Sequence, residues 1–150
     1  MKRSPNRNAF TLIEVLIVVI IMAVLAATII PQFSQSTDDA KLSAVDFNMH
    51  TMQTQIEMYR FQHNGDYPAL DSIVDQLTKA TNVNGGLTGD TRFGPYMQEI
   101  PNNPYNESNE IVSVATPGTE PTGTVEGGTA GWQYDQTTGR IYPNHDDYYE

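Results

Sequence analysis

The strongest feature of the sequence is a nearly continuous apolar run from Phe10 to Ile30, in which Glu14 is the single charged residue. As a helix, residues 10–30 would reach about 31 Å, close to the roughly 30 Å thickness of a bilayer's hydrocarbon core. A carboxylate inside lipid costs on the order of 3 kcal/mol, so a purely hydrophobic anchor has no reason to carry one. The run therefore predicts a membrane-spanning helix with a functional acid near its start.

A second hydrophobic pattern follows, with spacings of three and four residues that place its members on one face of a helix. The stripe comprises Leu42, Val45, Met49, Met52, Ile56 and Tyr59, broadened by Ala40, Ala44 and Phe47. His63-Asn64-Gly65 provides a helix stop, and Pro68 prevents early resumption. We expect one helix from about residue 10 to about residue 62, its later half facing a small sheet.

The rest of the chain predicts short elements between loops rich in Gly and Pro. We expect a second helix at about residues 71–80, a strand at 111–115, and a hairpin formed by 131–135 and 140–142. Gly139 can take a positive φ in the turn, and Trp132 is expected in the core. The predicted fold class is α+β: a long helix packed on a small antiparallel sheet.

Charge is divided unevenly along the chain. Lys2, Arg3 and Arg7 precede the apolar run, whereas five basic residues face seventeen acidic ones after Ile30, a net charge of −12. The excess of positive charge before the span predicts a cytoplasmic N-terminus and an exported acidic body. Such a body is a poor binder of nucleic acid, which needs clustered Lys and Arg. Because the sequence has no cysteine, packing or a metal must stabilise the body.

The apolar run alone allows three interpretations. A cleaved secretory signal would explain the basic start and the small-residue site at Val24-Leu25-Ala26, although the run continues past that site and contains Glu14. A plain uncleaved anchor is the second interpretation, and a specialised anchor is the third. Hydrophobic periodicity does not choose among them.

The segment Ala9-Phe10-Thr11-Leu12-Ile13-Glu14 closely resembles the processing site of type IV prepilins and type II secretion pseudopilins. The resemblance implies cleavage between Ala9 and Phe10, N-methylation of Phe10, and a Glu fifth in the mature chain. Pro31 then falls twenty-second, where the family commonly places a helix-kinking Pro. One departure is that the family usually has Gly before the cut, where this chain has Ala9. Gly65-Asp66-Tyr67-Pro68 resembles a Gly-x-Tyr-Pro motif of pseudopilins.

The resemblance also implies a domain organisation and a function. Residues 1–9 would be a prepilin-type leader, 10–30 a transmembrane and assembly helix kinked near its end, and 31–150 a periplasmic pseudopilin domain. The protein would be a structural subunit of the periplasmic pseudopilus of a type II secretion system, most like the major, G-type pseudopilin. The alternative is a type IV pilin of a surface fibre for adhesion, motility or DNA uptake. The lack of cysteine favours the first, because many pilins close a C-terminal loop with a disulfide.

The implied partners follow from that role. We expect a homopolymer that also takes up minor pseudopilins, a prepilin peptidase, an inner-membrane assembly platform and the lipid bilayer itself. The implied location is the bacterial inner membrane, crossed once, with the N-terminus cytoplasmic and the C-terminal domain periplasmic. In the fibre, Glu14 is expected to pair with the α-amino group of Phe10 of a neighbouring subunit.

No pattern predicts catalysis, so we do not expect an enzyme. His50, His63 and His145 lie far apart without metal-ligand spacing, and phosphate loops and nucleophile elbows are absent from the sequence. No cofactor is expected. Asp146 and Asp147 are weak calcium candidates, because carboxylates suit a hard cation; the simpler interpretation is a solvated acidic tail.

Overall fold

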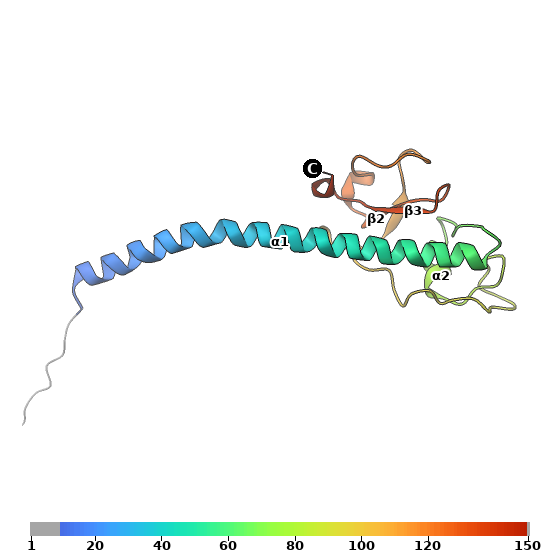
Figure 1. The fold of residues 1–150 in the computed structure, drawn as a ribbon, viewed down its shortest axis with the longest axis horizontal. Helices are drawn as coiled ribbons and strands as arrows, with labels where there is room; N and C mark the ends of the chain where they lie inside the picture. The colour runs from blue at the N-terminus through green and yellow to red at the C-terminus, as the bar shows by residue number, and fades with distance from the viewer. Residues whose placement is uncertain (1–9, 150) are drawn as a thin grey trace, which may run out of the picture. The chain divides into compact units, whose positions relative to one another are not determined.

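The computed structural model describes residues 10–149, apart from the side chains of residues 30–35 and Glu126. The chain divides into two compact units, Met1–Ala40 and Lys41–Glu150. Its elements, in order, are helix α1 (Leu12–Gln62), helix α2 (Ile73–Thr78), strand β1 (Ile111–Ser113), the 3₁₀ turn η1 (Glu126–Gly128), strand β2 (Trp132–Asp135), strand β3 (Arg140–Pro143) and the 3₁₀ turn η2 (Asp146–Tyr148) (Figure 1).

Helix α1 ends where the sequence predicts. The backbone N–H of Gly65 donates to the carbonyl of Arg60 over 3.0 Å, which closes the last turn from outside the helix. Asn64 and Gly65 have φ values of 58° and 91°, a left-handed conformation that Asn and Gly adopt most readily. α1 is helical through residue 31, and the kink expected at Pro31 stays a prediction because that side chain lies outside the described residues.

The predicted hairpin is confirmed. β2 pairs antiparallel with β3, with Trp132 opposite Pro143 and Asp135 opposite Arg140. Gly139 closes the turn at φ 69°, and a Cβ at this position would collide with the ring of Tyr67. Gly139 is therefore required twice, by its conformation and by the close approach of the ring.

The sheet as a whole differs from the expectation in one respect. Its order is β1-β2-β3, and β1 runs parallel to β2, with Ile111 opposite Trp132, so the sheet is mixed and not purely antiparallel. A parallel pair needs a connection of about a dozen residues or more to bring the chain back to the starting end. The segment from residue 114 to 131 is long enough to do so.

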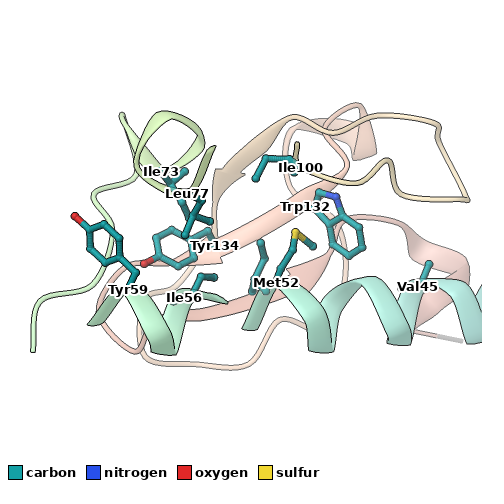
Figure 2. Close-up of a cluster of buried hydrophobic side chains, with 10 residues drawn as sticks. Val45, Met52, Ile56, Tyr59, Ile73, Leu77, Ile100, Trp132 and Tyr134 are labelled. Atoms are coloured by element: carbon teal, nitrogen blue, oxygen red, sulfur yellow. The ribbon is translucent and has the colours of Figure 1, made fainter. Parts of the chain in front are cut away.

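The core of the second unit lies between α1, the sheet and α2, as Figure 2 shows. Its fully or almost fully buried members are Val45, Met52, Ile56, Tyr59, Ile73, Leu77, Ile100, Trp132, Tyr134 and Ile141. The indole Nε1 of Trp132 donates to the carbonyl of Pro101 over 2.8 Å, so the ring is buried without an unpaired donor. The helical stripe and the core position of Trp132 are confirmed.

Three residues assigned to the stripe are exposed, namely Leu42, Phe47 and Ala40, so these assignments are wrong. The second helix is also shorter than expected. Leu42 is 41% exposed and Phe47 is 72% exposed. Phe47 follows the buried Val45 by two positions, about 200° around the helix, which turns it away from the sheet. α2 stops at Thr78, because the chain becomes extended at Lys79 and pairs Thr81 with Phe93.

We expect Met52→Asp to destabilise the protein by about 3 kcal/mol or more, because it would bury an unpaired charge. Met52 has no exposed surface, whereas Met58, the same residue type on the same helix, is 46% exposed. Met58→Asp is therefore the matched control and should cost less than about 1 kcal/mol. Thermal or urea unfolding of the full chain in detergent measures both. Equal losses for the two variants would contradict the observed core.

Candidate assembly and processing site

Glu14 forms a capping box with Thr11 at the start of α1. The Thr11 backbone N–H and its hydroxyl Oγ1 each donate to Glu14 Oε2 over 2.8 Å. In return, the Glu14 backbone N–H donates to Thr11 Oγ1 over 3.3 Å. This reciprocal pattern satisfies donors that the first turn of a helix would otherwise leave unpaired.

The capping box leaves part of the carboxylate available. Both bonds to the side chain end on Oε2, and Oε1 accepts no hydrogen bond within the described residues. A carboxylate offers about four acceptor positions, so Oε1 can still receive a donor. The sequence contains the Thr-x-x-Glu signature of such a box just before the apolar run, but hydrophobicity alone gives no reason to single out Thr11.

The helix that follows is apolar and uncovered within its own unit. Leu12–Ile29 has a mean hydropathy of 3.0, is long and apolar enough to cross a membrane, and has none of its residues buried. Phe10, just before the cap, is 86% exposed. A signal sequence near the N-terminus would meet the same test of length and composition. The low burial does separate this segment from the core helix of a folded domain.

Two of the site residues predicted from the sequence lie wholly or partly outside the part of the chain that the structure describes. Ala9, before the expected cut, lies outside the described residues, as does the side chain of Pro31. Their roles in processing and assembly stay predictions.

The three histidines occupy three separate environments. His63 is buried, with Nδ1 2.7 Å from the Tyr59 carbonyl, Nε2 2.9 Å from Thr81 Oγ1, and its ring stacked on Tyr59. His50 is exposed on α1, and His145 caps η2 through Nδ1. None of them shares a site with another, and His63 is fully used by packing and hydrogen bonds.

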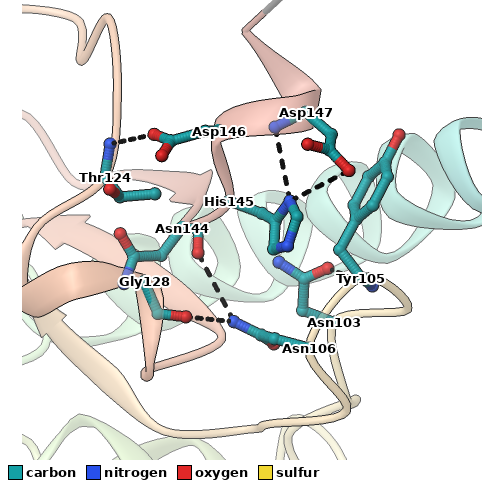
Figure 3. Close-up of polar contacts among 9 residues, drawn as sticks. All are labelled: Asn103, Tyr105, Asn106, Thr124, Gly128, Asn144, His145, Asp146 and Asp147. Atoms are coloured by element: carbon teal, nitrogen blue, oxygen red, sulfur yellow. Dashed lines mark hydrogen bonds and ion pairs between the residues drawn. The ribbon is translucent and has the colours of Figure 1, made fainter.

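The calcium candidates Asp146 and Asp147 face different partners (Figure 3). Asp146 Oδ1 accepts from the Thr124 backbone N–H over 3.3 Å. Asp147 Oδ2 lies 3.8 Å from His145 Nδ1. Among the described residues, no three His, Asp or Glu side chains gather in a way that could hold a metal ion.

The side chain of Asn106, the first residue of an Asn-Glu-Ser glycosylation triplet, makes hydrogen bonds within the fold. Its Nδ2 donates to the carbonyls of Gly128 and Ala130 over 2.9 and 2.8 Å, and it also reaches the carbonyl of Asn144. Figure 3 shows this side chain joining two segments that are distant in sequence. The amide nitrogen that a glycan would occupy is therefore already used.

Comparison with known protein families shows which family the chain belongs to. Residues 4–30 match the prokaryotic N-terminal methylation motif, and residues 32–131 match the type II secretion system (T2SS) protein G family. The chain belongs to the type II secretion system protein G family. The predicted resemblance to a pseudopilin is thereby confirmed, and the surface-pilus alternative is not favoured. The match to protein G ends before Trp132, so the β2–β3 hairpin lies beyond it.

Individual relatives agree with this assignment. The chain is 28% identical over 120 residues to type II secretion system core protein G of Vibrio cholerae, covering 79% of this chain and 80% of the relative. The protein of the same name from Pseudomonas aeruginosa is 27% identical, with 75% and 78% covered. That of Escherichia coli is 21% identical, with 75% and 77% covered. No solved structure matches the chain.

A chelator titration tests the calcium candidates. We expect excess EDTA to leave the melting temperature almost unchanged, because Asp146 and Asp147 are used in separate contacts. A calcium ion present at a hundred times its Kd would contribute about 2.7 kcal/mol, enough to move the melting temperature by several degrees. Such a drop, reversed by calcium and absent in Asp146→Asn, would establish a site there.

Proposed function

We propose that this member of the protein G family polymerises through its N-terminal helix, and that Glu14 sets the register between neighbouring subunits. The observation that carries the proposal is the apolar helix of the first unit, uncovered along Leu12–Ile29 and headed by a single carboxylate. The family to which the chain belongs builds the pseudopilus of the type II secretion system. The protein is a structural subunit of such a fibre.

The proposal also covers the partners, the processing and the membrane orientation of the subunit. The subunit binds further copies of itself and minor pseudopilins, is processed by a prepilin peptidase, and is added to the fibre at an inner-membrane platform. Before assembly it crosses the bacterial inner membrane once, with the basic N-terminus cytoplasmic and the acidic body periplasmic. The uneven charge on the two sides of the span supports this orientation. We propose no catalytic activity for the chain.

The capping box indicates which oxygen of Glu14 would bind the α-amino group of a neighbouring subunit. Cleavage before Phe10 would create an α-amino group, and that cation needs a partner in an apolar fibre core. Glu14 of a neighbouring subunit offers Oε1, while Thr11 of its own subunit continues to hold Oε2. A charge left unpaired in such surroundings is strongly destabilising, so only the axial offset that brings amine and carboxylate together is favourable.

The processing step can be tested directly. Intact-mass and N-terminal analysis of protein extracted from membranes should give a mature chain that begins with N-methylated Phe10, because leader, Phe10 and Glu14 follow the spacing of the methylation motif. Blocking the peptidase should restore the full-length mass. A mature chain starting at Ala27 would indicate a classical signal peptide and contradict the assembly proposal.

Two variants, Glu14→Val and Glu14→Gln, distinguish a role of Glu14 in the ion pair between subunits from its role in the helix cap. Glu14→Val should insert in the membrane and fold, yet fail to join fibres of wild-type subunits, because the partner of the α-amino group is lost. Glu14→Gln keeps a side chain that can complete a capping box but removes the charge. We expect it also to be excluded, by at least about tenfold, since a charge-assisted bond is roughly twice as strong as a neutral one.

Incorporation is measured by shearing and by cross-linking of fibres from cells that co-express wild-type and tagged variant subunits. Thr11→Val is the complementary control, because it removes the cap and leaves the carboxylate. If Glu14→Gln assembles normally while Thr11→Val does not, the acid serves the helix cap and not the register between subunits.

A further inference from the structure

The two outer strands of the sheet have different edges. In the order β1-β2-β3, β1 and β3 each have one side without a neighbouring strand. The outer edge of β3 is covered by side chains: the Ile141 N–H donates to Gln53 Oε1 over 3.2 Å, and the Pro143 carbonyl accepts from the Tyr149 hydroxyl over 2.8 Å. Pro143 itself has no N–H to leave unpaired. Side chains from outside the sheet thus take the place of a fourth strand beside β3.

The outer edge of β1 has no such cover. The Glu110 carbonyl accepts from β2 over 3.0 Å and the Val114 N–H donates to β2 over 3.2 Å, and residues along a strand alternate between its two edges. The backbone groups of Ile111 and Ser113 therefore point away from β2, and they make no hydrogen bond with any described residue. An open strand edge of this kind is a template for pairing with another chain.

A groove of about 560 Å³ lies beside the start of β1, bounded by α2 and by residues 98–100. Its apolar lining consists of Leu70, Val74, Ile100 and Ile111. Val74 is 44% exposed, so the fold of the second unit leaves an apolar side chain of α2 uncovered there. The volume lies within the range of about 300–1,000 Å³ typical of binding pockets, which is enough for the side chains of a strand added to β1.

The charged residues of the groove are all acidic. Asp71, Glu99 and Glu110 line it and are exposed, and the lining includes no Lys, Arg or His. None of the three forms an ion pair with a described residue, and Lys79, the base that follows α2, already pairs with Asp75 over 2.7 Å. The groove therefore favours a positively charged occupant and disfavours an acidic one.

A second copy of this chain does not meet that requirement. The five basic residues after Ile30 stand far apart in the sequence, at Lys41, Arg60, Lys79, Arg92 and Arg140, in a body whose net charge is −12. The basic cluster of residues 2–7 lies before the membrane span, on the opposite side of the bilayer from the second unit in the orientation proposed above. A segment with two neighbouring bases must therefore come from a different protein.

We propose that the outer edge of β1 and the adjoining groove bind an extended segment of another protein, with an apolar side chain between two lysines or arginines. The segment adds a strand to the sheet, and its backbone forms hydrogen bonds with Ile111 and Ser113. The apolar side chain packs against Leu70 and Val74, and the basic side chains pair with the acids of the groove. This binding is independent of Glu14 and of assembly through the N-terminal helix.

The test uses the full chain in a zwitterionic detergent and follows backbone amide hydrogen exchange by NMR. The probe is the peptide acetyl-Lys-Thr-Val-Thr-Lys-amide. At saturation we expect the amides of Ile111 and Ser113 to exchange at least about tenfold more slowly, because they gain hydrogen bonds. The Val114 amide, which already bonds to β2, should change little. The matched control is the same peptide with two successive central amides N-methylated, which keeps the side chains but blocks strand pairing.

Reversal of one charge tests the acids of the groove. Glu110→Lys should weaken binding of the lysine peptide by at least about tenfold, because like charges then face each other. It should also bind acetyl-Glu-Thr-Val-Thr-Glu-amide more tightly than the parent protein does. Glu120→Lys, which changes an exposed acid outside the groove, should leave both affinities almost unchanged. The melting temperatures of the two variants should agree, since both side chains are exposed.

Three results would overturn the proposal. Equal binding of the N-methylated peptide, or unchanged exchange at Ile111 and Ser113, would show that no strand is added to β1. Equal losses of affinity in Glu110→Lys and Glu120→Lys would show that the groove does not recognise the basic side chains. Slower exchange of the Ile111 and Ser113 amides at higher protein concentration without peptide would show that a second copy occupies the edge.

Discussion

The packing of one face of α1 against the small sheet is the interaction on which the second unit depends. The sheet has only three short strands and α2 only six residues, so neither could bury an apolar surface alone. α1 provides a continuous face from Val45 to Tyr59, and Trp132, Tyr134 and Ile141 meet it from the sheet. Polar contacts fix the register, since Gln53 donates to the Gly139 carbonyl and accepts from the Ile141 N–H.

Long loops surround this core, and polar side chains take the place of the disulfides that the chain lacks. Asn144 and Asn106 bind backbone groups of the segment before β2, and Asn103 Nδ2 donates to the Gly131 carbonyl over 2.8 Å. Asp135 binds the loop after β1. Burial raises the pKa of Asp135, but hydrogen bonds from Gly118, Thr138 and Thr137 together hold that pKa below its usual value. These residues order a region with little regular structure.

Patterns along the sequence predicted those parts of the fold that neighbouring residues decide. The end of α1 at Asn64-Gly65 and the β2–β3 hairpin each depend on a local conformation that Gly favours, and the structure has both. The parallel position of β1 could not be predicted in this way, because it depends on where a long loop returns. Phe47 was misplaced since a broad apolar stripe does not reveal how narrow the covering sheet is.

The same distinction applies to the candidate sites. Glu14 was found because a charge in an apolar segment is costly wherever the segment lies, but its bond to Thr11 concerns a helix end and required a different signature. Glu14 Oε1 accepts no hydrogen bond within the described residues, and a carboxylate at the start of an apolar helix needs a partner, which is why assembly is proposed at Glu14 and not at the fully paired His63 or Asn106.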